Sequence, residues 1–116
     1  MDVAREIQFC KLIDKIECDY GLYIGVKSIA SLSHFLDGYR FRCFEESNYL
    51  LSFQSEFQTF IEKKYHSTSV RSWKDIIKCN LPEDEAFDLF YRLYRQFLRE
   101  TDYGRNVSNT GDGTMC

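Results

Sequence analysis

Apolar residues recur every three or four positions through five segments of this chain, and that spacing places them along one face of an α-helix. The pattern predicts helices over about 2–18, 28–47, 49–65, 70–79 and 82–100. No internal repeat relates these segments to one another. We therefore expect an all-α fold, a compact bundle of about five helices.

The segment 28–47 is predicted to be the central helix of this bundle. Its main apolar stripe consists of Leu32, Leu36, Tyr39 and Cys43. Phe41 and Phe44 lie well away from that stripe, and a helix that is apolar on more than one side is usually buried on more than one side. Gly38 costs this helix roughly 1 kcal/mol relative to alanine, so we expect another backbone to approach closely there.

The segment 82–100 separates its apolar and charged residues most clearly. Its apolar side holds Phe87, Phe90, Leu93, Tyr94 and Phe97. Its charged side holds Glu85, Asp88, Arg92, Arg95 and Arg99. Pro82 is followed directly by three acidic residues, which is typical of a helix start.

The segments between the helices contain the residues that end and begin them. Residues 19–27 contain two glycines and are expected to form an extended connection, with Tyr23 or Ile24 packed against the core. Ser28 is the expected cap of the central helix. Either Thr68 or Ser69 is expected to cap the short helix over 70–79.

The end of the chain lacks helical periodicity and is rich in glycine, asparagine and threonine. We therefore predict one helical domain over 1–100 and a flexible tail over 101–116.

Charge limits the expected partners. The chain has 116 residues, and 15 Lys and Arg against 18 Asp and Glu give a net charge of −3. Domains that bind a nucleic-acid backbone usually carry a basic stripe and a high pI, whereas the pI here is about 5.4. Nucleic acid is therefore not the expected partner, and a weakly acidic surface slightly favours a basic protein.

The five cysteines show no CxxC spacing, which indicates free thiols in a reducing compartment. Cys10, Cys43 and Cys79 are expected to be buried as small hydrophobes. The first residues lack the apolar run of a secretory signal, and no segment approaches the ~18 consecutive apolar residues that a membrane span requires. These features predict a cytoplasmic protein with no membrane partner.

His34 and His66 are the candidate catalytic histidines, but no nucleophile or base accompanies either at a suitable spacing. The cysteines are scattered and no ExxH pair occurs, so no metal site is expected. Neither GxGxxG nor GxxxxGKS/T occurs, so no phosphate-binding loop is expected. The sequence thus predicts a protein that is not an enzyme and has no cofactor.

Two charged features have both a structural and a functional interpretation. One is the arginine stripe of Arg92, Arg95 and Arg99. It could contact nucleic acid, but Glu85 and Asp88 share its face, and pairing along the helix explains it without a ligand. The other is the pair of acidic clusters at 45–46 and 83–88, which are typical of solvated helix ends. They could also dock a basic partner, because rim charges speed association.

The run from Ser28 to Leu98 contains SIASLSHFLDGYRF, FQTFIEKKY, SWKDIIKC and EDEAFDLFYRLYRQFL. It resembles a group of small bacterial proteins with the order FLxGY, FxxFhxxKY, a Trp followed by paired aliphatics, and a closing acidic-to-aromatic helix. The residues in the first three motifs are Phe35, Leu36, Gly38 and Tyr39, then Phe57, Phe60, Lys64 and Tyr65, then Trp73, Ile76 and Ile77. Most members have no assigned activity, and some similar proteins accompany polymorphic or contact-dependent inhibition toxins as their immunity proteins.

The resemblance implies an immunity protein that binds and neutralises a cognate bacterial toxin domain, possibly a nuclease, by protein–protein contact, and it implies no catalytic residue. Acidic residues and tyrosines suit such a contact, because aromatic anchors and complementary charge dominate protein interfaces. The expected contact residues are Asp37, Glu45, Glu46, Glu83, Asp84 and Glu85, with Tyr23 and Tyr49 as exposed anchors.

Two alternatives remain open at this point. The chain could be a helical adaptor or regulator, a homodimer in which the side of segment 28–47 that holds His34 and Phe41 pairs with a second copy. It could also be a small enzyme or nucleic-acid factor that uses His34 or the arginine stripe.

Overall fold

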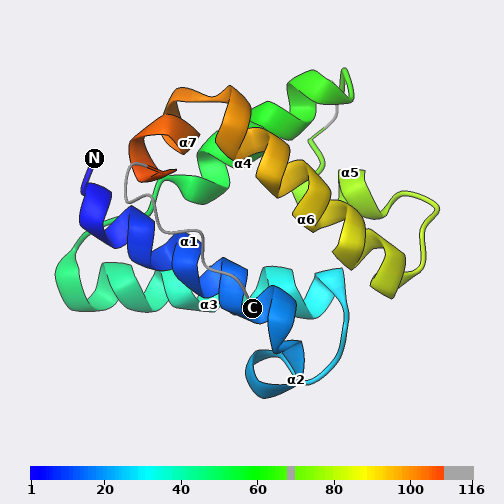
Figure 1. Cartoon of the computed structure of the whole chain (residues 1–116), viewed down its shortest axis with the longest axis horizontal. Helices are drawn as coiled ribbons and strands as arrows, with labels where there is room; N and C mark the ends of the chain where they lie inside the picture. Colours follow the sequence, from blue (N-terminus) through cyan, green and yellow to red (C-terminus); the bar gives the residue numbers. More distant parts are fainter. Residues whose placement is uncertain (68–69, 109–116) are drawn as a thin grey trace.

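The computed structural model describes residues 1–67 and 70–108, and this part of the chain contains helices and no strand. The predicted all-α fold is confirmed. The helices are α1 (Val3–Cys18), α2 (Tyr20–Tyr23), α3 (Ile29–Ser47), α4 (Phe53–Lys64), α5 (Trp73–Lys78), α6 (Glu83–Glu100) and α7 (Asp102–Val107). In Figure 1, α1 and α3 run along the lower side of the molecule, and α4, α6 and α7 lie above them.

Helix α6 is the element around which the core is built. It packs against α3, α4, α5 and α7. Its buried aromatic side chains are Phe87, Phe90, Tyr91, Tyr94 and Phe97. The ring of Phe57 on α4 lies 5.4 Å from the ring of Phe90 and 5.3 Å from that of Phe97. Such edge-to-face contacts add to the free energy of apolar burial, so α6 is held on several sides by rings.

Helix α3 does not occupy the central position that we expected. Its first half is buried through Ile29, Leu32 and Leu36, but Phe41 and Phe44 keep 66% and 43% of their surface exposed. Apolar residues on two sides of a helix predicted burial on both sides, and here only one side is covered by the described chain. The prediction for α3 was therefore wrong, and α6 takes the central place.

Gly38 also differs from the expectation. A Cβ atom added at this position would meet no atom of the described chain within 4 Å. The expected close approach of another backbone is therefore absent at Gly38. It is found instead at Gly104, where an added Cβ would lie 2.0 Å from the carbonyl oxygen of Leu98.

The connection before α3 is helical where an extended segment was expected. Residues Tyr20–Tyr23 form the single turn of α2, and Gly25 follows with a φ of 82°. Tyr23 and Ile24 are half-buried against the core, as predicted. The glycines therefore end a helical turn, and they do not prevent one.

Two helix caps were predicted, and one is confirmed. The Ser28 hydroxyl accepts a hydrogen bond from the amide of Ser31 at 3.2 Å and caps α3. Helix α5 begins later than expected, and its cap is Ser72, whose side chain accepts from the amide of Asp75. Thr68 and Ser69, the residues predicted to cap it, lie outside the described residues.

The start of α4 is also later than predicted. Asn48 adopts a φ of 58° and ends α3. The chain then runs through Tyr49 and Leu50 before α4 begins at Phe53. Leu51, within that connection, is 2% exposed, so the apolar pattern continued through a buried loop and not through a helix.

The predicted tail begins too early. Residues Asp102–Val107 form α7, and Tyr103 and Val107 are buried in the core. Only glycine at position 104 permits this helix to pack against the end of α6, because a Cβ would collide with Leu98. Residues 109–116 of the predicted tail lie outside the described part of the chain.

The cysteines and the helix hydropathy complete the comparison with the sequence predictions. Cys10 is buried as expected, Cys43 is half-buried, and Cys79 is exposed, so the prediction of burial fails for Cys79. These three cysteines are free, but Cys18 is disulfide-bonded, so the prediction of free thiols was wrong for Cys18. None of the described helices combines the length and apolar character that a membrane crossing requires.

Candidate protein-binding surfaces

The predicted acidic contact residues fall into two groups, one on the middle and last turns of α3 and one beside its start. Asp37, Glu45 and Glu46 lie on α3 itself and are exposed. Glu83 and its acidic neighbours belong to the first turn of α6, which is attached at Ser28, the start of α3. The rise of an α-helix separates Ser28 from Glu45 by about 25 Å. The structure therefore does not bring the predicted acids together in one cluster.

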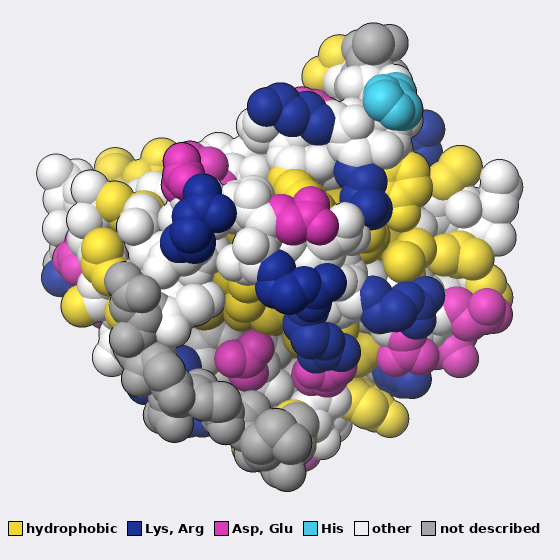
Figure 2. Space-filling view, turned by 45° about the horizontal axis from the view of Figure 1, so that its top comes forward, with side chains coloured by type: hydrophobic (Ala, Val, Ile, Leu, Met, Phe, Trp, Pro, Cys, Tyr) yellow, Lys and Arg dark blue, Asp and Glu magenta, His cyan; other side chains and the backbone are white. Residues whose placement is uncertain are grey.

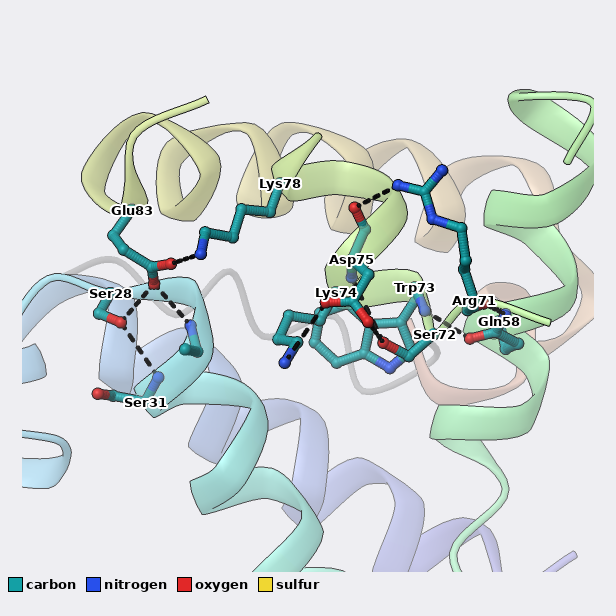
Figure 3. Close-up of polar contacts among 11 residues, drawn as sticks. Ser28, Ser31, Gln58, Arg71, Ser72, Trp73, Lys74, Asp75, Lys78 and Glu83 are labelled. Atoms are coloured by element: carbon teal, nitrogen blue, oxygen red, sulfur yellow. Dashed lines mark hydrogen bonds and ion pairs between the residues drawn. The ribbon is translucent and has the colours of Figure 1, made fainter. Parts of the chain in front are cut away.

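Glu83 is occupied by contacts within the fold (Figure 3). Its Oε1 accepts hydrogen bonds from the hydroxyl of Ser28 at 2.6 Å and the amide of Ala30 at 3.0 Å. Its Oε2 lies 2.7 Å from Nζ of Lys78. The hydrogen bond from Lys78, followed by those from Ser28 and Ala30, lowers the pKa of this carboxyl from 4.5 to about 2. Glu83 thus joins α5 and α6 to the start of α3 and has little capacity left for a partner.

Neither predicted tyrosine anchor is exposed. Tyr49 is half-buried, and its hydroxyl donates to Oε2 of Glu6 at 2.6 Å. Burial, followed by this hydrogen bond, raises the pKa of Tyr49. Tyr23 is also half-buried, and its ring lies 6.2 Å from that of Phe35. Both tyrosines therefore serve the packing of the chain.

A first exposed surface forms where residues 20–27 lie against the start of α6. The ring of Tyr20 lies 5.8 Å from that of Phe87, and Nζ of Lys27 lies 3.0 Å from a carboxylate oxygen of Asp88. The hydrogen bond to Asp88 raises the pKa of Lys27. These contacts bring two segments together that are about sixty positions apart in the sequence.

We call this region the α2–α6 surface, and it consists of Leu22, Val26, Asp84, Glu85 and Asp88. Leu22 is 73% exposed and Val26 is 55% exposed. Asp84 and Glu85 are exposed, and neither forms an ion pair with any residue of the described chain. Leu22 and Val26 were missed as site residues because nothing in a short glycine-flanked segment indicates which of its apolar residues face solvent.

A second exposed surface is the outer side of the second half of α3, with the residue that follows it. We call it the α3 outer face, and it consists of Asp37, Gly38, Arg40, Phe41, Phe44 and Leu50. Leu50 is 57% exposed, beside the exposed rings of Phe41 and Phe44. A shallow hollow of about 320 Å³ lies among Asp37, Arg40 and the three apolar side chains.

A buried carboxylate, Glu6, was not anticipated from the sequence. It has no exposed surface. Its Oε1 accepts from the hydroxyl of Tyr103 at 2.6 Å, and its Oε2 accepts from the amide of Ser52 at 2.8 Å in addition to Tyr49. The Tyr103 hydroxyl is also 3.8 Å from Sγ of Cys10, whose pKa burial raises to about 11. Every donor in this cluster is satisfied within the fold, so the cluster is structural.

Glu6 could not be recognised in the sequence because it occupies an ordinary polar position in the first turns of α1. Its donors come from the connection before α4 and from α7, and the prediction had assigned α7 to a flexible tail.

The other candidates for chemistry remain apart from one another. His34 and His66 are both exposed. Among the described residues, no group of three or more His, Cys, Asp or Glu side chains could hold a metal ion. A hollow of about 210 Å³ between α1 and α3 contains Arg5 and Arg42, but these cations pair with Asp2 and Glu46.

The arginine stripe is partly neutralised. Arg95 forms two hydrogen bonds with the carboxylate of Glu17, at 2.8 and 2.9 Å. The hydrogen bonding to Glu17 raises the pKa of Arg95. Figure 2 shows a face of the molecule on which basic and acidic side chains are interspersed with apolar ones. The side chains visible there do not form a continuous basic track.

Comparison of the chain with protein-family models, with curated proteins and with solved structures found no match. The fold and the two surfaces therefore define the protein as an all-α protein with two exposed apolar areas, each accompanied by charged side chains.

Proposed function

We propose that this chain acts by binding another protein, as an immunity protein that neutralises a bacterial toxin domain and catalyses no reaction. The observation that carries the proposal is the α2–α6 surface, where residues 20–27, with exposed Leu22 and Val26, lie against the start of α6, with exposed Asp84 and Glu85. Interfaces between proteins commonly have an apolar centre and a polar rim. The resemblance of the motifs between Ser28 and Leu98 to small bacterial proteins supplies the kind of partner.

The charge of the α2–α6 surface supports a basic partner. Asp84 and Glu85 are exposed and carry charges that no cation of the described chain pairs. Complementary charge at an interface chiefly raises the association rate and excludes wrong partners. A basic domain, such as a nuclease, has the opposite charge and would be attracted to this surface.

The polar groups elsewhere support binding over catalysis. The buried carboxylate of Glu6 is engaged by Tyr103, Tyr49 and Ser52, and Glu83 is engaged by Lys78 and Ser28. A general acid or base must reach the proton that it transfers, and these carboxylates are committed to holding helices together. The remaining exposed acids are suited to contact with another molecule.

A second candidate function is that of a homodimeric adaptor or regulator. The observation that favours it is the α3 outer face, whose apolar side chains are exposed at a distance from the acids of α6. The two surfaces do not share residues, so one chain can use both.

The immunity function requires that the reading frame directly upstream of this chain encode a large secreted protein, and the C-terminal domain of that protein is the partner to test. The purified domain should bind this protein, and Asp84→Lys with Glu85→Lys should slow association about tenfold at low salt and reduce its salt dependence. Glu56→Lys with Glu100→Lys changes the charge equally at exposed acids elsewhere and should leave the rate nearly unchanged. Absence of such an upstream gene, or absence of binding, contradicts the immunity function.

If the domain binds and both pairs of substitutions act alike, the function stands and the α2–α6 surface is not the contact site. Stopped-flow kinetics at two salt concentrations distinguishes these outcomes.

A further inference from the structure

The α3 outer face is apolar and exposed, and it contains a shallow hollow. Phe41, Phe44 and Leu50 expose 66%, 43% and 57% of their surface, and they border the hollow of about 320 Å³. Exposed apolar patches of a few hundred Å² are often functional on monomeric proteins. The distance along α3 between Ser28, where α6 is attached, and Phe41 is about 20 Å. This face is therefore separate from the α2–α6 surface.

Two opposite charges flank Gly38. Asp37 is exposed and Arg40 is half-buried, and neither forms an ion pair within the described chain. A two-fold axis passing between Gly38 and Tyr39 relates position 37 of one antiparallel helix to position 40 of the other. Asp37 of each copy then faces Arg40 of the other copy, and two equivalent ion pairs form. The charges of this face are therefore complementary to themselves.

From these features we infer that the chain forms a two-fold symmetric homodimer through the α3 outer face, with the two α3 helices antiparallel and Asp37 of each copy opposite Arg40 of the other. In such an isologous contact the same patch of both copies is buried. Phe41 and Phe44 supply the apolar centre of the contact, and Asp37 and Arg40 fix its register.

The size of the patch sets the expected strength. A standard interface buries about 800 Å² on each partner, whereas the exposed parts of Phe41, Phe44 and Leu50 contribute on the order of 300 Å². The dimer should therefore be weak, with a dissociation constant on the order of 10–100 μM. The inference does not depend on the toxin partner, because its contact residues differ from those of the α2–α6 surface.

The decisive experiment is sedimentation equilibrium over about 5 μM to 1 mM protein. The wild-type chain should show a monomer–dimer equilibrium. Asp37→Arg and Arg40→Asp, each alone, should raise the dissociation constant at least about tenfold, because each places like charges opposite one another. An equimolar mixture of the two variants should dimerise about as well as the wild type, because the basic pair of one chain then faces the acidic pair of the other.

Phe41→Ser tests the apolar centre of the contact. It should weaken the dimer several-fold while circular dichroism shows the same helix content, and the matched variant Val26→Ser, at an exposed apolar residue elsewhere, should leave the dimer unchanged. A wild-type chain that stays monomeric throughout, or a mixture no more dimeric than its components, overturns the inference. A Phe41→Ser dimer of full strength contradicts the apolar centre.

Discussion

The carboxylate of Glu6 connects three separate parts of the chain. It lies on α1 and accepts hydrogen bonds from Tyr103 on α7 and from Tyr49 and Ser52 in the connection before α4. A buried carboxylate is tolerated only when its oxygens are well paired. Each of these donors, if left without an acceptor, costs about 1–3 kcal/mol. Glu6 therefore contributes to stability out of proportion to its size.

The first prediction concerns this residue. Glu6→Ala should lower the free energy of unfolding by about 3 kcal/mol, because two tyrosine hydroxyls and one amide lose their acceptor. Gln8→Ala, on the exposed side of the same helix, is the matched control and should change it by less than about 0.5 kcal/mol. Urea denaturation followed by circular dichroism measures both variants, and equal effects would show that the Glu6 contacts do not stabilise the fold.

The second prediction concerns Glu83, whose pKa falls from 4.5 to about 2 on folding. The folded state thus binds this proton more weakly than the unfolded state, so the stabilisation is full above about pH 5 and is lost as the pH falls towards 2. Glu83→Gln should therefore flatten the decline of the unfolding free energy between these pH values.

Lys78→Met provides the companion measurement, because the hydrogen bond from Lys78 is the largest cause of the lowered pKa of Glu83. In this variant the pKa of folded Glu83 should lie closer to its unfolded value, so the loss of stability at low pH should be smaller than in the wild type and should end at a higher pH. Urea unfolding at a series of pH values measures all three proteins, and a Glu83→Gln profile parallel to that of the wild type would refute the assignment.

At the scale of helices, the two faces of α6 were predictable because eighteen residues repeat the same separation of rings and charges. Helix α7 was not, because six residues are too short to show periodicity. Its position depends on a contact with the end of α6 that only the folded chain forms. Sequence patterning therefore identified the long helices and the short α5, and it missed the short helices α2 and α7.

The case of α3 shows a different limit. Its sequence correctly indicated apolar residues on two sides, but a pattern along one helix cannot show how many neighbours cover it. Leu36 is fully buried, whereas Phe41, five residues later, is 66% exposed. The same limit affects Gly38, because a glycine in the sequence does not show whether another backbone approaches it, and none does within the described chain.

The third prediction belongs to the contact between α6 and α7. Gly104→Ala would place a Cβ atom 2.0 Å from the carbonyl oxygen of Leu98, so α7 must shift and the free energy of unfolding should fall by about 2 kcal/mol. Gly21→Ala has open space and should not destabilise the chain. Thermal unfolding compares the two variants, and an undiminished melting temperature for Gly104→Ala would contradict the described packing of α7.

At the scale of the whole molecule, the candidate site could be predicted only in part. Asp84 and Glu85 are exposed as expected, because charged residues in the first turn of a helix usually face solvent. Glu83 and Tyr49 were expected to be available, but their partners Lys78, Ser28 and Glu6 come from other parts of the chain. Whether an acid is free or engaged depends on such tertiary contacts.

The two proposals concern different surfaces of the molecule. We propose that the α2–α6 surface presents exposed acids to a basic partner, and that the α3 outer face pairs with a second copy through apolar side chains and complementary charges. A dimer formed through the second half of α3 would present the α2–α6 surface twice, which would increase the avidity for a partner that carries two sites.

We propose that this protein works by contact and not by catalysis. Growth of cells tests this most directly, when they express the C-terminal domain of a large secreted protein encoded directly upstream, with and without this chain. The wild-type chain and the variant His34→Ala with His66→Ala should both restore growth, whereas Asp84→Lys with Glu85→Lys should lower the number of surviving cells at least about tenfold. Failure of the wild type to restore growth, or loss of protection in the histidine variant while its fold is intact, would contradict the account.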